Sequence, residues 1–279
     1  VGNHEFDLTP AALQQALDTA FSVAPQFPLV SANAILNAPE VQGLRQYIRP
    51  YIIKQIGNKK VGIFGMTTPS ANVMSQPSPV FIDTNIIQIA AAMVDTLTAQ
   101  HCNLIICLSH LGLSLDEAVA SYVPGIHAII GGHDHYLLNQ PEPVRNPAGD
   151  TTWICQANAF YLDMGKLKFA VSNTGARLLN AQIIPINNTM PADSDVAKRC
   201  AAFLSSVLPG STVTYLEVHS SFLSFLSSFF ISSSRSQTFN RVLLLGRIRE
   251  VRDLVPSGGA DGEAEALKGL FCGPFRDRP

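Results

Sequence analysis

The chain has 279 residues, of which 47% are apolar and 14% are charged, and its formal net charge is −2. This length and apolar content allow one large core or two small ones, and so little charge argues against disorder over most of the chain. The lysines and arginines form no basic stripe, so binding to a nucleic-acid polymer has no electrostatic support.

The chain opens on its most chemically specific hexapeptide. Residues 2–7 read Gly-Asn-His-Glu-Phe-Asp, in which an amide, a histidine and two carboxylates follow a glycine. Because the first residue lies directly before this motif, we expect the chain to be a fragment of a longer protein.

The first third of the chain predicts helices that alternate with strands. Thr9 and Pro10 begin a helix, because proline is favoured in the first helical turn, and its apolar face is formed by Leu13, Ala16, Leu17, Ala20 and Phe21. A strand is expected over 27–32. The next two strands, 51–56 and 60–66, are expected to form a hairpin across a tight turn at Gly57-Asn58.

Further elements follow in the middle of the chain. A long amphipathic helix is indicated by the apolar series Ile86, Ala90, Met93, Val94 and Leu97. Residues 104–108 and 126–130 are short apolar runs that are typical of buried strands. Between them, residues 114–117 read Ser-Leu-Asp-Glu, a capping box that predicts the start of a short helix. Three consecutive antiparallel strands are expected over 152–156, 162–171 and 176–184.

Histidine motifs stand at the ends of both apolar runs. His110 follows the first run in Ser-His-Leu-Gly, and His133 and His135 follow the second in Gly-Gly-His-Asp-His. Ligands of open α/β sheets sit beyond the carboxyl ends of the strands, so we expect these motifs and the pair Asn3-His4 to converge on one site.

The three motifs, in this order and at these separations, resemble the last three motifs of the calcineurin-like metallophosphoesterases. Phe6-Asp7 and residues 65–69, Gly-Met-Thr-Thr-Pro, resemble the 5'-nucleotidase branch in particular. The resemblance covers residues 2–186. It implies an α/β fold class, the metallophosphoesterase-type two-sheet sandwich flanked by helices, here N-terminally truncated and followed by an unassigned C-terminal tail.

The resemblance also implies a metal site. Asn3, His110 and His133 would be ligands of one metal ion, and His135 would be a ligand of its neighbour. Imidazole nitrogens and an amide oxygen suit Zn, Mn or Fe. Two such divalent ions would activate water for in-line attack on phosphorus.

Two further roles follow from the resemblance. His4 would act as the catalytic histidine beside the phosphate, and Asp7 would orient it. The implied activity is metal-dependent hydrolysis of phosphoesters of the 5'-nucleotidase type, with a small-molecule nucleotide as substrate. The resemblance also implies an extracytoplasmic location.

The family's first two motifs do not occur in the chain. They are an Asp-x-His and a Gly-Asp whose carboxylate bridges both metals, and Gly149-Asp150 is expected to be a turn in a loop rather than a substitute. We therefore expect at most one ion to bind and the chain as given to be inactive. The alternative is a non-catalytic remnant. Within the enzyme class, a cyclic-nucleotide 2'-phosphodiesterase and a nucleotide-sugar hydrolase remain open.

We expect three segments: a catalytic domain over 1–188, a linker helix over 189–209 and an unassigned tail over 210–279. The apolar run at 222–231 is too short to span a bilayer of about 30 Å, and arginine replaces lysine beyond it. A hydrophobic anchor and a basic tail are alternatives, but we favour a tail that is not family sequence. The five cysteines indicate free thiols rather than a disulfide framework.

Several residues near the motifs have plainer interpretations. We expect His127 to pack within the sheet and Glu5 to be a structural partner of its loop. Asp134, between the two histidines, should point away from them. Phe160 and Tyr161 are expected to be core residues rather than a base-stacking platform.

Overall fold

The computed structural model describes residues 1–23, 26–187 and 189–207. The tail expected over 210–279 lies outside the described residues. Residues 1–186 form one compact unit, and the helix α5, Ser194–Val207, belongs to a second unit. Within the part of the chain that the structure describes, no helix combines the length and apolar character needed to cross a membrane.

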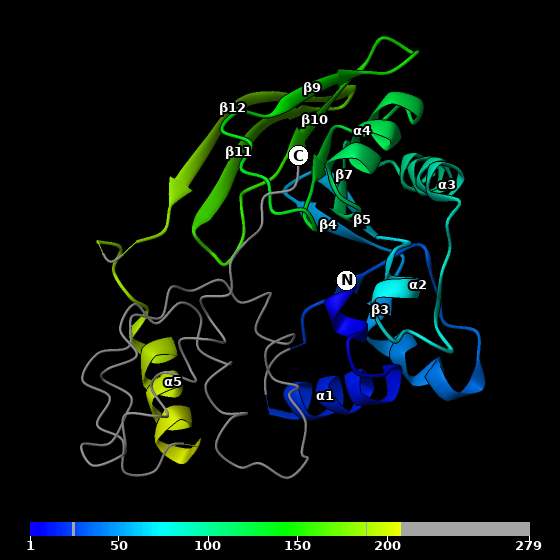
Figure 1. Cartoon of the computed structure of the whole chain (residues 1–279). Coiled ribbons are helices and arrows are strands. Elements are labelled where there is room, and N and C mark those ends of the chain that lie inside the picture. Colours follow the sequence, from blue (N-terminus) through cyan, green and yellow to red (C-terminus); the bar gives the residue numbers. More distant parts are fainter. Residues whose placement is uncertain (24–25, 188, 208–279) are drawn as a thin grey trace, which may run out of the picture. The chain divides into compact units, whose positions relative to one another are not determined.

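The centre of the first unit is a six-stranded mixed sheet (Figure 1). Its four central strands run parallel, and antiparallel strands flank them at both edges. Across the sheet the strands are β4 (Tyr51–Ile56), β5 (Lys59–Thr67), β7 (Leu104–His110), β8 (Ala128–Ile130), β10 (Thr151–Cys155) and β9 (Glu142–Arg145).

Two helices contribute to the core of this sheet. α3 (Ile86–Ala99) contacts β5, and α4 (Leu113–Tyr122) contacts α3, β9 and β10. The apolar positions of α3 face inward, and Ala90 and Leu97 are fully buried. Together with the sheet they form one apolar cluster, which includes Phe64, Met66, Ile105, Val119 and Ile129.

A second apolar cluster lies beneath the first motif. Phe6 packs there with Leu17 of α1 (Pro10–Val23) and with Leu44 of a 3-10 helix, Pro39–Gln46. A one-turn 3-10 helix, His4–Phe6, and the short α2, Ala71–Met74, complete this region. The buried Phe6 side chain therefore anchors the segment that carries His4.

The remaining strands form pairs. β1 (Leu29–Val30) runs parallel to β3 (Ile48–Arg49), and β2 (Ala34–Ile35) runs antiparallel to β6 (Phe81–Ile82). A long antiparallel hairpin joins β11 (Asp163–Ser172) to β12 (Gly175–Pro185). The expected α/β fold class with several sheets and flanking helices is confirmed.

Most of the expected elements occur. Thr9 accepts a hydrogen bond from the Ala12 amide at 3.1 Å, so it caps α1 as expected. The hairpin of β4 and β5 turns at Gly57, whose φ is +59°. The strand expected over 27–32 is shorter, because only Leu29–Val30 is paired as a strand. The cysteines of the described residues are free thiols.

Two expectations about local structure are wrong. β10 does not join an antiparallel run with β11 and β12; it lies parallel to β8 and pairs antiparallel with β9, an unexpected strand. The capping box is also wrong, because α4 begins at Leu113 with Gly112 as its N-cap, two residues earlier than a box with Ser114 as N-cap requires. Asp134 accepts a hydrogen bond from the Leu113 amide at 2.7 Å, so a distant carboxylate takes the place of a local cap.

Gly65 allows two layers of the unit to approach closely. A Cβ atom at this position would lie 2.2 Å from the carbonyl oxygen of Val30, which is backbone and cannot rotate away. The Ala32 amide donates to the Gly65 carbonyl at 2.7 Å, so the segment that follows β1 is hydrogen-bonded to β5. Only glycine fits this crossing.

Replacing Gly65 should therefore destabilise the unit strongly. We expect Gly65→Ala to lower the free energy of unfolding by about 3 kcal/mol or more, because overpacking against backbone cannot be relieved by a rotamer change. The matched control is Gly57→Asn, at a turn where φ is +59° and an added Cβ atom would have no neighbour within 4 Å. This change should alter stability by less than about 1 kcal/mol. Urea unfolding followed by circular dichroism measures both, and equal losses would contradict the account.

Candidate active site

The pairing of β7 with β8 brings two histidine motifs to one edge of the sheet. The strands are parallel, and Leu108 pairs with Ile130 near their carboxyl ends. His110 is the last residue of β7, and His133 follows β8 after two glycines. Both motifs therefore leave the sheet in the same direction, as expected for a ligand site of an α/β fold.

His110 lies directly against the first motif. Its Nε2 atom is 3.0 Å from the Oδ1 atom of Asn3, whose side chain is buried. A Cβ atom at residue 2 would lie 2.8 Å from the His110 ring, so Gly2 permits this approach. The Oδ1 atom of Asn3 and the Nε2 atom of His110 thus lie together, although the two residues are 107 positions apart in sequence.

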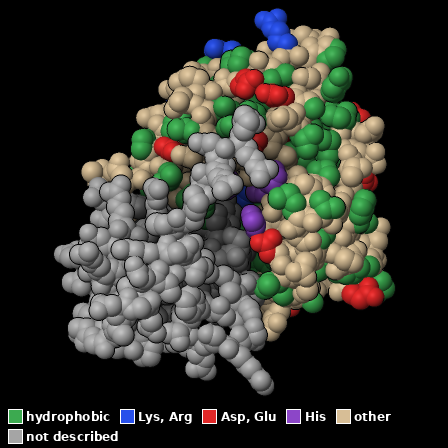
Figure 2. Space-filling model, in the orientation of Figure 1, with side chains coloured by type: hydrophobic (Ala, Val, Ile, Leu, Met, Phe, Trp, Pro, Cys, Tyr) green, Lys and Arg blue, Asp and Glu red, His purple; other side chains and the backbone are tan. Residues whose placement is uncertain are grey.

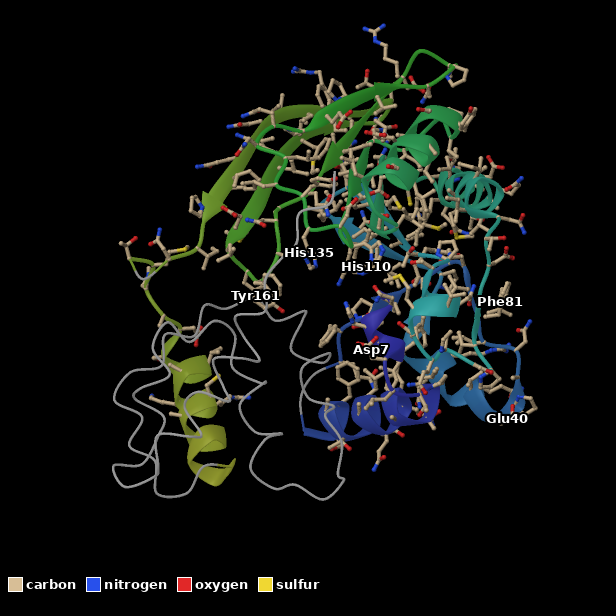
Figure 3. All side chains as sticks on the ribbon, viewed as in Figure 1. Asp7, Glu40, Phe81, His110, His135 and Tyr161 are labelled. Carbon is tan, nitrogen blue, oxygen red and sulfur yellow. The ribbon has the colours of Figure 1, made fainter. Side chains whose placement is uncertain are left out.

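The other histidines surround this pair. The ring centroids of His110 and His133 are 5.2 Å apart. His133 and His135 both have left-handed backbone conformations, with φ of +86° and +62°, so the loop turns sharply at each ligand candidate. Figure 3 shows the side chains of His110 and His135 directed toward the region of Asp7. On the face shown in Figure 2, histidine side chains reach the surface.

Burial favours the neutral form of His110 and His133. Desolvation lowers the pKa of His110 to about 4, with further contributions from His133, His4 and His135. Desolvation also lowers the pKa of His133. A neutral imidazole keeps a nitrogen lone pair free, which is the form that binds a metal ion.

His4 occupies a different environment. Its Nδ1 atom lies 2.7 Å from Asp7 Oδ2, and both side chains are exposed to solvent. Asp7 is held from the other side, since Ser75 donates to its Oδ1 at 3.2 Å and Gln76 donates to its backbone carbonyl at 3.2 Å. His4 is therefore an oriented and accessible imidazole beside the buried pair.

Asp116 is a buried carboxylate that the sequence interpretation missed as part of this site. Ser109, which precedes His110, donates a short hydrogen bond to its Oδ1. A Cβ atom at Gly131 would lie 2.5 Å from Asp116 Oδ2. The side chain thus reaches from α4 to the ends of both strands that carry the histidines, and we regard it as a positioning residue.

Neighbouring residues have structural roles. Glu5 accepts a hydrogen bond from the Gly2 amide at 2.5 Å, as expected for a partner of the loop. Asp134 accepts from Leu113 and from Gln156, each at 2.7 Å, so its oxygens anchor the loop. His127 lies at the edge of the core, where its Nδ1 accepts a hydrogen bond from the Ile105 amide at 3.1 Å.

The expected core position of Phe160 is wrong. Its side chain is 78% exposed, and its ring lies edge-on to His135 with centroids 5.4 Å apart. Phe160 and Tyr161 both have positive φ, +54° and +57°, which lifts this segment out of the regular strand before β11 begins.

The donor set determines which ions would fit. Two donor atoms at about 2.1 Å from one ion are separated by about 3 to 3.5 Å, and the Asn3 and His110 donors meet this condition. No group of three or more His, Cys, Asp or Glu side chains within the described ranges is arranged to hold a metal ion. An ion at this edge would therefore depend on the Asn3 amide oxygen as well as on imidazoles.

Comparison with known proteins finds relatives of the chain. The snake venom 5'-nucleotidase of Crotalus adamanteus is 30% identical over 236 residues, which are 77% of this chain and 40% of that protein. The trifunctional nucleotide phosphoesterase YfkN of Bacillus subtilis is 29% identical over 214 residues, 67% of this chain and 14% of its own length. No protein-family model matches the chain.

Solved structures agree with the sequence relatives. The structure of a 5'-nucleotidase precursor from Thermus thermophilus superposes with a TM-score of 0.66 at 29% identity, over 77% of this chain and 44% of that one. The structure of YfkN, a calcineurin-like phosphoesterase, shares the fold with a TM-score of 0.53 at 22% identity, over 74% of this chain and 68% of that one. The chain belongs to the 5'-nucleotidase family, and it shares the fold of a calcineurin-like phosphoesterase. It spans less than half the length of the curated relatives it matches.

The carboxyl group of Asp116 should make stability depend on pH in a defined direction. Burial raises its pKa from 3.8 to about 7, so between these values the native state holds a proton that the unfolded chain has lost. Its contribution to the free energy of unfolding is therefore largest below about pH 4 and is lost as the pH rises through about 7. Asp116→Asn removes this titration, and its Oδ1 can still accept from Ser109.

We expect the stability of the parent chain relative to Asp116→Asn to fall between about pH 4.5 and about pH 8. His110 acts in the opposite sense, because its lowered pKa makes stability rise with pH, but it is common to both proteins and cancels in the difference. Urea unfolding at several pH values measures the difference. A difference that stays constant over this range would show that Asp116 is ionised in the native state.

Proposed function

We propose that this chain carries part of the nucleotide-hydrolysing site of a metal-dependent phosphohydrolase of the 5'-nucleotidase type. The observation that supports this most strongly is the meeting of Asn3, His110 and His133 at one sheet edge, with the two inner imidazoles neutral. The relatives are named as 5'-nucleotidases and as a nucleotide phosphoesterase. The substrate in this proposal is a nucleoside monophosphate or a related ester.

In this proposal Asn3, His110 and His133 hold one divalent ion, and His135 is the first ligand of a second. Such ions, when bound, activate water and neutralise phosphoryl oxygens. Zn, Mn and Fe suit this mixture of imidazole and amide donors better than Mg or Ca. Asp116 stabilises the positions of both histidine-bearing strands through Ser109 and its contact at Gly131.

His4 and Asp7 provide the proton transfer in the proposed mechanism. Asp7 accepts a hydrogen bond from a protonated His4 Nδ1, which leaves the opposite ring nitrogen to face a phosphoryl group or leaving oxygen. Exposure of both side chains keeps His4 available to a substrate that arrives from solvent. His4 can then stabilise charge on the phosphoryl group or protonate the leaving group.

The second candidate is a non-catalytic remnant that binds at most one ion. It is favoured by a specific observation, the lack of a three-member cluster of His, Cys, Asp or Glu in the part of the chain that the structure describes. Without a carboxylate to bridge two ions, their spacing is not fixed, and a single ion on Asn3, His110 and His133 is the expected limit. Cyclic-nucleotide 2'-phosphodiesterase and nucleotide-sugar hydrolase activities remain alternatives within the enzyme class.

The proposal extends to location. One relative is a venom 5'-nucleotidase, and we propose an extracytoplasmic site of action for this protein as well.

Metal binding should separate the proposed ligands from His4. We expect His133→Ala to weaken Mn²⁺ binding by about tenfold or more, because it removes a direct ligand. His4→Ala should leave the affinity unchanged within about twofold, since in the proposal His4 does not coordinate. Mn²⁺ titration followed by electron paramagnetic resonance measures both, with His101→Ala, on an exposed histidine, as the matched control. Loss of binding in His4→Ala at unchanged folding would overturn the assignment.

Hydrolysis should require groups in addition to the proposed metal ligands and His4. We expect residues 1–279, loaded with Mn²⁺ or Zn²⁺, to release no phosphate from AMP and to leave a chromogenic phosphodiester intact, because the bridging carboxylate is missing from the site. A form joined to an Asp-x-His and Gly-Asp segment of a relative should hydrolyse AMP. In that form His4→Ala should lower kcat by about 10² to 10⁴ while metal content holds. Metal-dependent turnover by residues 1–279 that disappears in His4→Ala would contradict the single-ion interpretation.

A further inference from the structure

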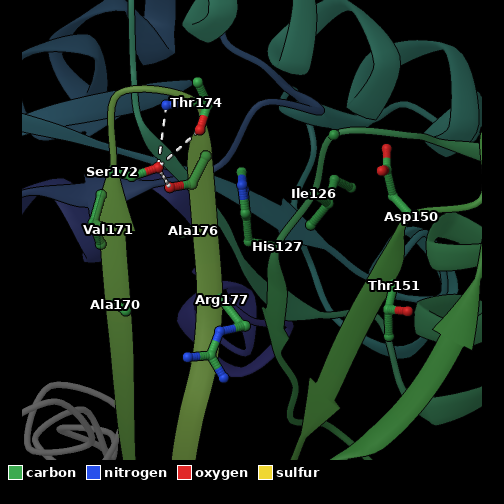
Figure 4. A pocket seen from close by; sticks show the side chains of 12 residues that line it. Ile126, His127, Asp150, Thr151, Ala170, Val171, Ser172, Thr174, Ala176 and Arg177 are labelled. Carbon is green, nitrogen blue, oxygen red and sulfur yellow. Dashed lines mark hydrogen bonds between the residues drawn. The ribbon is translucent and has the colours of Figure 1, made fainter.

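A cavity lies at the end of the sheet opposite to the histidine edge. It has a volume of about 550 Å³, within the range of about 300 to 1,000 Å³ that is usual for small-molecule sites. Its walls are the residues before β8, the start of β10 and the tip of the β11–β12 hairpin (Figure 4). His127 precedes β8 and His133 follows it, so the strand separates this cavity from the proposed metal site.

His127 presents a hydrogen-bond donor to this cavity. Its Nδ1 accepts the Ile105 amide at 3.1 Å, so in the neutral ring the proton is on Nε2. Nε2 faces the hairpin, since a Cβ atom at Gly175 would lie 3.8 Å from it. Burial lowers the pKa of His127, which favours this neutral tautomer.

Three other polar side chains on the walls lack a hydrogen-bond partner, although the charge of Asp150 acts on His127 and raises its pKa. The guanidinium of Arg177, the carboxylate of Asp150 and the hydroxyl of Thr151 form no hydrogen bond or ion pair with any of the described residues. The hydroxyls at the hairpin tip behave differently. Ser172 hydrogen-bonds with Thr174 and donates to the Gly175 carbonyl, both at 3.1 Å, as the dashed lines in Figure 4 show. The unpaired groups therefore line one cavity from two separate segments, residues 150–151 and strand β12.

We propose that this cavity binds a small zwitterion of the amino-acid type, with its carboxylate at Arg177 and His127 and its ammonium group at Asp150. Arg177 offers a permanently charged fork that matches a carboxylate, and the His127 Nε2–H adds a second donor. Asp150 supplies the acceptor for an ammonium group, and the Thr151 hydroxyl can bond to either end of the ligand.

The mixed charge of the walls selects against simpler ligands. A plain anion would gain from Arg177 but would be repelled by Asp150, and a plain cation would meet the reverse situation. A zwitterion satisfies both walls and leaves no charged side chain unpaired. The volume exceeds that of an amino-acid backbone, so the cavity also accommodates a side chain.

The test begins with residues 1–279 and the twenty common L-amino acids, each titrated up to about 10 mM and followed by calorimetry and by the NMR signal of the His127 ring. For the amino acid that binds best, the analogue without the amino group and the amine without the carboxylate are then compared. We expect each analogue to bind at least about tenfold more weakly, the effect of losing one charge-assisted contact. Binding of none of the twenty, or equal binding of both analogues, would overturn the proposal.

Variants locate the site. Arg177 and Asp150 lie at the protein surface rather than in its core, so Arg177→Ala and Asp150→Asn should fold normally. Each should weaken binding by about tenfold, and Arg177→Lys should restore part of the loss because it keeps the charge. The matched controls are Arg145→Ala on β9 and Asp95→Asn on α3, two exposed residues outside the cavity. Equal weakening by the controls would place the ligand elsewhere.

Discussion

Parallel pairing between β7 and β8 is the constraint on which the proposed site depends. The register that pairs Leu108 with Ile130 makes the two strands end side by side, and their next residues are the two histidine motifs. Asp116 stabilises this edge, because its side chain accepts a hydrogen bond from Ser109 and occupies the space beside the Cα atom of Gly131. The Asn3 segment reaches the same edge, where Gly2 permits it to lie against the His110 ring.

In the proposed site, differences in solvent exposure divide the histidines by chemical role. His110 is deeply desolvated, and its low pKa keeps it neutral near pH 7, as a metal ligand must be. His4 lies on the exposed side and is oriented by Asp7, the arrangement that suits a group which must exchange protons with a substrate. One small region thus holds imidazoles that are suited to coordination beside one suited to proton transfer.

Much of this could be predicted from the sequence, because the informative residues stand beside strong patterns. Buried runs such as 104–108 mark strands whatever their partners, and glycines after them mark the strand ends. The role of Asp116 was harder to predict. The sequence of its segment matches a local capping box, whereas its side chain is hydrogen-bonded to Ser109 on β7. The cap of α4 comes from Asp134, 21 positions away, and no local pattern can reveal such a partner.

Strand pairing and loop conformation were the least accessible features. β9 lies between β8 and β10 in the sequence, and it runs antiparallel to β10 at the edge of the sheet, so that β10 runs parallel to β8. The Glu-Pro-Val-Arg sequence of β9 has no strand signature. Phe160 is a large apolar residue of the kind that usually lies in a core. Its positive φ turns the backbone away from the path of a strand, and its ring lies beside His135.

The most direct test of the central claim is a crystal structure of the Mn²⁺-loaded protein with anomalous diffraction. The account predicts a manganese peak about 2.0 to 2.3 Å from Asn3 Oδ1 and from one ring nitrogen each of His110 and His133, with His4 outside the coordination shell. A peak bound instead by His4, or no peak at this edge in saturating Mn²⁺, would contradict it.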